Sequence, residues 1–299
     1  MSNSKRRGIL LIALGNPYYG QLAANLAASI KFTTSGKLPI HLVWSENALD
    51  HLTPQKMQMF DEVQECPHEM YHRGDGKRVY VKAKTHIYDL SKFDETIFLD
   101  VDVIMLQKRT LLDAFEDLKH LDFTMECRSR INIGKDAFED SYLWANAHDI
   151  KRAYDFKDGF LYGLHSEFIY FKKCEKVARY FETVKEVFAH PKVKMKHVFD
   201  GDIPDEFAFA IAMIKHRMYP HKCPYIPLYW YLTDAKTLGT SKQKMLDNHY
   251  GYSVGGNATP PAVRQTYNQL ASAYSQRMGV QYPFKIVQKR QVLRSRKSM

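Results

Sequence analysis

The first 44 residues constrain the fold most strongly, because two apolar segments flank a helical pattern there. Residues 8–14 form a nearly continuous apolar run, which is typical of a strand buried on both faces of a parallel sheet. After a turn at residues 15–20, apolar side chains recur at every fourth position over residues 22–30, as on one face of a helix. Residues 39–44 then predict a second strand. This β-turn-α-β order indicates the start of an α/β sheet.

Later segments continue this alternation of helices and strands. We expect further strands at residues 96–99, 123–126 and 167–171, and helices over residues 79–90, 177–188, 204–218 and 262–277. Residues 128–160 mix charged, aromatic and turn-forming side chains without a clear period, so we interpret them as an insertion. We therefore expect one α/β domain over residues 8–255, followed by a helix and a basic tail over residues 256–299.

The length and composition are those of an ordinary folded chain. With 299 residues, the chain can form one large domain or two modest ones. Its 45% apolar and 25% charged residues exclude a mostly disordered chain. The aliphatic run Ile9–Leu14 is much shorter than the roughly 20 apolar residues of a membrane-spanning helix. We therefore expect no transmembrane segment.

Cysteine spacing bears on the cellular compartment. The chain has four widely separated cysteines and no C-x-x-C pair: Cys66, Cys127, Cys174 and Cys223. This spacing is typical neither of a structural zinc site nor of a disulfide framework. We expect four reduced thiols and a cytoplasmic protein.

The net charge of +10 is concentrated at the two ends of the chain. Residues 5–7 and 284–299 carry several lysines and arginines and no acidic residue, whereas the remainder is nearly neutral. Such runs suit the phosphates of a nucleic acid or an anionic lipid surface, and they also occur as solvated tails. The sequence leaves these alternatives open.

Two acidic residues follow the strand predicted at residues 96–99, in the order Asp100-Val101-Asp102. Ligands of open α/β sheets bind beyond the carboxyl ends of the strands. Two carboxylates at that place are unfavourable unless a positive charge compensates them, and a divalent metal that bridges a diphosphate provides such compensation. The structural alternative is a pair of solvated acids at a strand end.

Three further side chains extend this candidate site. Lys84 precedes Asp100 by sixteen residues, on the helix predicted before the strand, and could contact a phosphate. Asp205 stands in the first turn of a predicted helix, where the helix dipole favours an acidic side chain. The functional alternative is that Asp205 stabilises a cationic sugar carbon. His249, two residues before Gly251, is a candidate metal ligand in a loop.

In this order, the residues resemble metal-dependent glycosyltransferases of the GT-A fold, above all the retaining family of glycogenin and the bacterial lipopolysaccharide galactosyltransferases. The resemblance covers roughly residues 8–255. Its most specific element is the sixteen-residue spacing from Lys84 to Asp100, with an apolar strand between them. It implies an α/β, Rossmann-like catalytic domain with a mixed central sheet flanked by helices.

The resemblance also implies roles for individual residues. Asp100, Asp102 and His249 would hold Mn²⁺ (or Mg²⁺). Asp205 and Glu206 would serve catalysis, with a glutamate in place of the family's glutamine. The donor, a UDP-sugar or another nucleotide sugar, would contact Ala13, Asn16, Tyr18, Tyr19, Lys84, Asp100, Val101, Asp102 and Ser166. The implied reaction transfers a hexosyl or pentosyl group to an acceptor hydroxyl, with retention at the sugar carbon.

The chain departs from the family pattern at two places. The Asn-Ser-Gly strand that frames the sugar in the family corresponds to His165-Ser166-Glu167, so that only the serine is retained. His249 and Gly251 are one residue closer together than in the family, and the Lys-Pro-Trp that normally follows is missing. These differences leave the donor sugar open, and another lysine would have to contact the phosphates.

The acceptor and two other functional classes also stay open. A glycan, a small molecule or a hydroxylated base in a nucleic acid could accept the sugar, and the basic C-terminal tail suits a polyanion. In a haloacid-dehalogenase-like phosphatase, Asp100 would be the nucleophile and Asp102 the general acid, although that fold normally begins with the motif strand. A non-catalytic nucleic-acid or membrane-binding module with a GT-A-like body is the other alternative.

Overall fold

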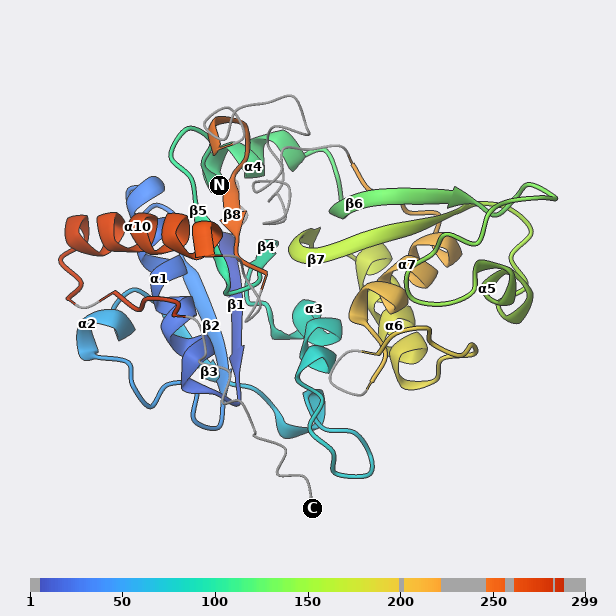
Figure 1. The fold of residues 1–299 in the computed structure, drawn as a ribbon, viewed down its shortest axis with the longest axis horizontal. Coiled ribbons are helices and arrows are strands. Elements are labelled where there is room, and N and C mark those ends of the chain that lie inside the picture. The colour runs from blue at the N-terminus through green and yellow to red at the C-terminus, as the bar shows by residue number, and fades with distance from the viewer. Residues whose placement is uncertain (1–5, 199–201, 222–245, 256–260, 282, 288–299) are drawn as a thin grey trace, which may run out of the picture.

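A six-stranded mixed sheet forms the centre of the molecule (Figure 1). The computed structural model describes residues 6–198, 202–221, 246–255, 261–281 and 283–287. The strands of the sheet are β1 (Arg7–Leu14), β2 (Ile40–Ser45), β3 (Glu62–Glu65), β4 (Glu95–Leu99), β6 (Phe123–Asn132) and β7 (Phe160–Lys172). Their order across the sheet is β3-β2-β1-β4-β7-β6. The first four are parallel to one another, whereas β7 runs antiparallel to both β4 and β6.

Helices cover the sheet on both faces. The α-helices are α1 (Pro17–Thr33), α2 (Pro54–Met57), α3 (Ile87–Leu90), α4 (Leu111–Leu118), α5 (Ala147–Ala153), α6 (Glu175–Ala189), α7 (Asp205–Lys215) and α10 (Pro261–Arg277). Two short 3₁₀ helices, η1 (His68–Met70) and η2 (Tyr80–His86), precede α3. In Figure 1, α10 lies beside α1, while α6 and α7 lie beside the β6–β7 hairpin.

The two hydrophobic core clusters explain the apolar run at the N-terminus. Ile9 and Leu11 belong to one cluster and Leu10 to the other, and all three are fully buried. Successive side chains of a strand point to opposite faces of the sheet, so β1 has to be apolar at every position. The predicted first strand and helix are therefore confirmed.

The turn between β1 and α1 is held by local contacts. Asn16 caps α1, because its side chain accepts a hydrogen bond from the backbone N–H of Tyr18 at 2.9 Å. Gly15 has a positive φ of 72°, which favours glycine. A Cβ at Gly20 would lie 1.8 Å from the carbonyl oxygen of Ala48, so the helix approaches that loop more closely than a larger residue allows.

A second, two-stranded sheet stands next to the central one. It pairs β5 (Val103–Met105) with β8 (Gly251–Ser253) in antiparallel register, with Val103 opposite Ser253 and Met105 opposite Gly251. β5 begins directly after Asp102. The backbone N–H of Val254 donates to the carbonyl oxygen of Asp102 at 3.1 Å, which continues the pairing to the acidic motif.

Two sequence predictions differ from the structure. The segment predicted as a helix over residues 79–90 is mainly the 3₁₀ helix η2, whose i→i+3 bonds give a tighter turn. The ends of the predicted insertion at 128–160 belong to β6 and β7, which pair as a long antiparallel hairpin with two register shifts. The outer half of β6 is partly exposed and carries polar side chains, so no alternation of apolar residues revealed it.

No helix in the described part of the chain combines the length and the apolar character that crossing a lipid bilayer requires. Cys66, Cys127 and Cys174 are free, and Cys223 lies outside the described residues. The basic tail beyond residue 287 also lies outside them.

His41 on β2 provides a test of the buried sheet. Both of its ring nitrogens are buried and have no hydrogen-bond partner among the described residues. Burial, with a smaller contribution from Lys92, lowers its pKa to about 4. Below the pKa of about 6.5 of an unfolded histidine, the unfolded chain therefore binds more protons than the folded one, and stability falls as the pH drops toward 4.

We expect the free energy of unfolding of His41→Leu to depend less on pH in this range. Between pH 6.5 and 4, the wild-type protein should lose up to about 3 kcal/mol more of its free energy of unfolding than the variant. Urea unfolding across that range measures the difference. Parallel curves for the two proteins would contradict the assignment.

Candidate active site

A half-buried lysine connects four elements at the carboxyl end of β4. Lys84 on η2 places its Nζ 2.6 Å from Oδ2 of Asp100, which directly follows β4. The same Nζ donates to Oγ of Ser166 on β7 at 3.0 Å and lies 3.9 Å from Oδ2 of Asp205 at the start of α7. The Ser166 hydroxyl in turn donates to Oε1 of Glu206 at 3.2 Å. The structure thus brings five sequence-predicted site residues together.

Carboxyl groups outnumber cations at this place. Burial, opposed by the charge of Lys84 and aided by that of Asp102, raises the pKa of Asp100 to about 7. Burial and the neighbouring Asp205 raise the pKa of Glu206 well above its usual value. Burial would lower the pKa of Lys84, but the charges of Asp100, Asp205 and Glu206 outweigh burial and raise it. Lys84 is therefore an ammonium, whereas part of the carboxyl cluster holds protons.

Glu167 adds a third carboxyl group beside the D-x-D motif. Its backbone carbonyl accepts a hydrogen bond from the N–H of Asp100 at 3.0 Å. Its Oε1 accepts one from the hydroxyl of Ser253, a fully buried residue of β8, at 2.9 Å. Burial, followed by the charges of Asp102 and Asp100, raises the pKa of Glu167 well above its usual value.

The β6–β7 hairpin contributes charged side chains that the sequence did not single out. Register shifts on both sides of Glu126 and Cys127 re-aim β6 where it faces His165. Glu126 pairs with Arg128 at 2.7 Å, yet burial raises its pKa to about 7. Burial and Arg128 lower the pKa of His165 to about 4, so His165 is neutral at physiological pH. No local sequence motif marks Glu126 and Arg128, because their position near the site depends on the pairing of β6 with β7.

The predicted nucleotide loop lies between β1 and α1. Ala13 is fully buried in β1, Asn16 is occupied as the cap of α1, and Tyr19 is 40% exposed. Tyr18 is partly buried, and burial and the charge of Asp102 raise its pKa to about 12, which places Tyr18 near the acidic motif. The Phe284 ring packs edge-on against Tyr18 at 5.4 Å.

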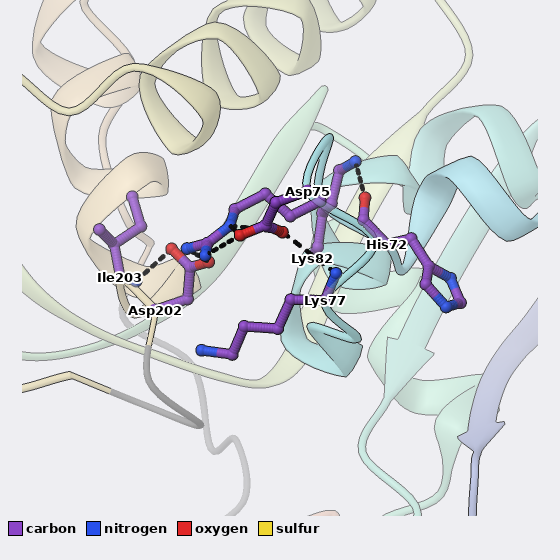
Figure 2. Close-up of polar contacts among 7 residues, drawn as sticks. His72, Asp75, Lys77, Lys82, Asp202 and Ile203 are labelled. Atoms are coloured by element: carbon purple, nitrogen blue, oxygen red, sulfur yellow. Dashed lines mark hydrogen bonds and ion pairs between the residues drawn. The ribbon is translucent and has the colours of Figure 1, made fainter.

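The start of α7 is tied to the loop that leads into η2 (Figure 2). Arg73 bridges Asp75 and Asp202, with its Nη1 3.3 Å from Oδ2 of Asp202. Asp202 also accepts a hydrogen bond from the backbone N–H of Ile203 at 2.9 Å. Lys82 Nζ donates to the carbonyl oxygen of His72 at 2.6 Å. These contacts hold together the two elements that carry Lys84 and Asp205.

His249 is not brought to the acidic motif. The β5–β8 register places Ser253 next to Asp102, and Tyr250 already pairs with Leu106 at the other end of β5. Among the described residues, no three His, Cys, Asp or Glu side chains are arranged to hold a metal ion. The metal set Asp100, Asp102 and His249 therefore stays a prediction, and the position of His249 does not support it.

Replacing Lys84 tests its place among the carboxyl groups. We expect Lys84→Met to lower the free energy of unfolding by roughly 1–3 kcal/mol at pH 8, because buried carboxylates lose their counter-charge. At pH 5 the loss should be smaller, since the carboxyl groups then take up protons. Urea unfolding at both values measures this, with Lys119→Met as the exposed control. A deficit that is absent or independent of pH would refute the arrangement.

Solved structures of glycosyltransferases share this fold. The bifunctional glycosyltransferase WbbM in its apo form matches 94% of this chain at 11% identity and a TM-score of 0.60, and the match spans 52% of WbbM. The galactosyltransferase LgtC, solved with donor and acceptor sugar analogs, matches 89% of this chain at 11% identity and a TM-score of 0.55, over 95% of its own length. GlyE from Streptococcus pneumoniae TIGR4 matches 94% of the chain at 13% identity and a TM-score of 0.53, over 65% of GlyE.

No family model matches the chain, and no curated protein matches its sequence significantly. At identities of 11–13%, the solved structures establish the architecture. Together with the mixed sheet flanked by helices, they confirm the predicted fold class. The chain has the GT-A fold of nucleotide-sugar glycosyltransferases.

Proposed function

We propose that the protein is a glycosyltransferase that moves a sugar from a UDP-sugar, or another nucleotide sugar, to an acceptor hydroxyl. The observation that carries this proposal is a partly buried group of contacting side chains at the carboxyl end of β4: Lys84, Asp100, Ser166, Asp205 and Glu206. In open α/β sheets this edge binds the ligand. The GT-A fold and the Lys84–Asp100 spacing support a nucleotide sugar as that ligand.

A divalent cation, Mn²⁺ or Mg²⁺, fits the acidic side of the site. The charge of Asp102 contributes to the raised pKa of Asp100, and the charges of Asp102 and Asp100 contribute to the raised pKa of Glu167. Lys84 provides a counter-charge at Asp100. Carboxylate oxygens are suitable ligands for such cations. Asp100 and Asp102 would hold the ion. When bound, it would act as a Lewis acid and neutralise charge on the departing diphosphate.

The protein's own residues would complete the reaction. Lys84 supplies a second positive charge next to the donor, and Ser166 fixes the orientation of both Lys84 and Glu206. Asp205 is buried, and its carboxylate stabilises the positive charge that develops at the sugar carbon as the acceptor hydroxyl attacks. The family resemblance supports retention at that carbon. The loop residues Ala13, Asn16, Tyr18, Tyr19 and Val101 would line the nucleotide.

The overall assignment of chain segments follows the same reasoning. We assign the catalytic domain to residues 8–255, with its excursion between β6 and β7, and assign residues 256–299 to a C-terminal helix and tail. A polyanionic acceptor or partner for that tail, and a cytoplasmic location, remain predictions from the sequence. The phosphatase alternative is weakened because the D-x-D motif follows β4, behind a complete β1-α1-β2 unit.

A panel of nucleotide sugars with Mn²⁺ tests the proposal, with released UDP as the measured product. We expect one donor to be consumed slowly even without acceptor, and we expect Asp102→Asn to reduce that rate by about 100-fold or more while the protein stays folded. The exposed Asp136→Asn serves as the matched control. Full activity of Asp102→Asn in Mn²⁺ would remove the metal assignment, and phosphate release from an aryl phosphate would favour the phosphatase.

The pH dependence of transfer tests the role of Glu206. Because burial and the neighbouring Asp205 raise its pKa, Glu206 keeps its proton to a higher pH than an exposed glutamate, and in that form it can donate a hydrogen bond as a glutamine amide does. As the pH rises through that pKa, the donor proton is lost and kcat should fall. We expect Glu206→Gln to remain active within about tenfold of wild type and to lack this alkaline decline. An unchanged pH profile in the variant would contradict the role.

A further inference from the structure

We propose that the cation at this site is held by Asp100, Asp102 and Glu167, so that a carboxylate from β7 takes the place that the family gives to a histidine. His249 is then not a ligand. The inference rests on the proposed function only in assuming that this edge of the sheet binds a divalent cation with the donor. It concerns which side chains of this chain hold the ion.

The pairing of β5 with β8 separates His249 from the acidic motif. Ser253 stands opposite Val103, the residue directly after Asp102. The backbone N–H of Leu106 donates to the carbonyl oxygen of Tyr250 at 2.9 Å, so pairing continues three residues away from Ser253. That stretch is roughly 10 Å long in an extended strand. His249 lies beyond it, on the side of β5 that leads away from Asp102.

Side-chain contacts of the residues around His249 confirm this direction. Tyr250 donates a hydrogen bond through its hydroxyl to Oδ2 of Asp117 on α4 at 2.6 Å. Asp247 pairs with Lys108 at 2.6 Å, between Oδ2 and Nζ. Both partners come after β5 in the chain. The segment that carries His249 is therefore anchored at the end of β5 remote from the D-x-D motif.

Glu167 is held next to Asp100 and Asp102, where a third metal ligand is needed. Its backbone carbonyl accepts the N–H of Asp100 at 3.0 Å, which fixes β7 beside the end of β4. Ser253, fully buried on β8, donates its hydroxyl to Oε1 of Glu167 at 2.9 Å. The neighbouring Val254 bonds the carbonyl oxygen of Asp102 at 3.1 Å. The Glu167 carboxyl on β7 thus contacts β8, and the residue that follows β8 bonds the backbone of Asp102.

One oxygen of Glu167 is available to a ligand. Oε2 is buried and accepts no hydrogen bond from the residues that the structure describes. The charges that act on this carboxyl most strongly are those of Asp102 and Asp100. A buried carboxylate oxygen without a donor is unfavourable, and a cation shared with Asp100 and Asp102 would satisfy it. The three side chains do not yet converge as a formed metal site, so they would turn toward each other when the ion binds.

The chemistry of the ligands suits this assignment. Three carboxylates form an all-oxygen set, which suits Mg²⁺ and Mn²⁺ and leaves coordination positions for the oxygens of a diphosphate. Ser253 orients Glu167 through a hydrogen bond, the way outer groups commonly fix a metal ligand. The chain departs from the family pattern at Glu167 and in the histidine loop. In this assignment the first change compensates for the second, because Glu167 supplies the ligand that the loop does not.

Electron paramagnetic resonance of bound Mn²⁺ tests this without any turnover. Pulsed spectra of the wild-type protein with Mn²⁺ should show no coupling to a histidine nitrogen. Titration should give a Kd for His249→Gln within about twofold of wild type, whereas Glu167→Gln should weaken binding by about 10- to 100-fold. Ser253→Ala, which leaves the carboxylate but removes its hydrogen bond, should weaken it several-fold. Asp102→Asn serves to show that the measured ion occupies this site, because its bound signal should disappear.

A histidine nitrogen coupling that His249→Gln removes, or a Glu167→Gln protein that binds Mn²⁺ as tightly as wild type, would overturn the inference. The wild-type spectrum decides the question even if Glu167→Gln fails to fold. If the protein consumes a UDP-sugar but shows the nitrogen coupling, this inference fails and the proposed function stands. If the ligands are carboxylates but no nucleotide sugar in the panel is consumed, the proposed function fails and this inference stands.

Discussion

The gathering of carboxyl groups around the ammonium of Lys84 is the interaction on which the described site depends. Lys84 bonds Asp100 at 2.6 Å and lies 3.9 Å from Asp205, while Glu206 shares the hydroxyl that Lys84 also bonds. Among the described residues, the charge of Lys84 does not by itself neutralise this group in a poorly hydrated place. The folded protein meets the imbalance by retaining protons on carboxyl groups. Under the proposed function, the same imbalance would favour the binding of a cation and of the phosphates that accompany it.

The architecture delivers these side chains from separate parts of the chain. Asp100 directly follows β4, and η2 carries Lys84. β7 contributes Ser166 and Glu167, and α7 begins at Asp205. The long β6–β7 hairpin matters here because β7 pairs with β4 and runs antiparallel to it, which brings the middle of β7 to the end of β4. The small β5–β8 sheet begins directly after Asp102, and Val254 bonds the backbone carbonyl of Asp102. A parallel sheet alone would not place three strands around one carboxylate.

Local patterns in the sequence were sufficient to predict those parts of the site that depend on a single strand or helix. The continuous apolar run of β1 indicated burial on both faces, and the apolar strand before Asp100 placed the acidic pair at a sheet edge. The spacing from Lys84 to Asp100 indicated that both residues belong to one site, and the structure places their side chains in direct contact. The type of the helix around Lys84 was wrong, because 3₁₀ and α-helices share much of their residue preference and differ in packing.

Features that depend on the pairing of distant segments could not be predicted from the sequence. The register shifts at Glu126 and Cys127 arise from the match with β7, and the positions of Ser253 and His249 follow from the register of β8 on β5. A shift of that register would move every side chain of β8 and of the residues before it, so no local motif could locate His249.

Calorimetric titration of UDP with and without Mn²⁺ tests the central claim most directly, namely that these carboxyl groups bind a nucleotide diphosphate through a cation. The account predicts saturable UDP binding in Mn²⁺ that becomes undetectable when the metal is removed. Equal affinity for UDP in the presence and absence of Mn²⁺, or no binding under either condition, would contradict it.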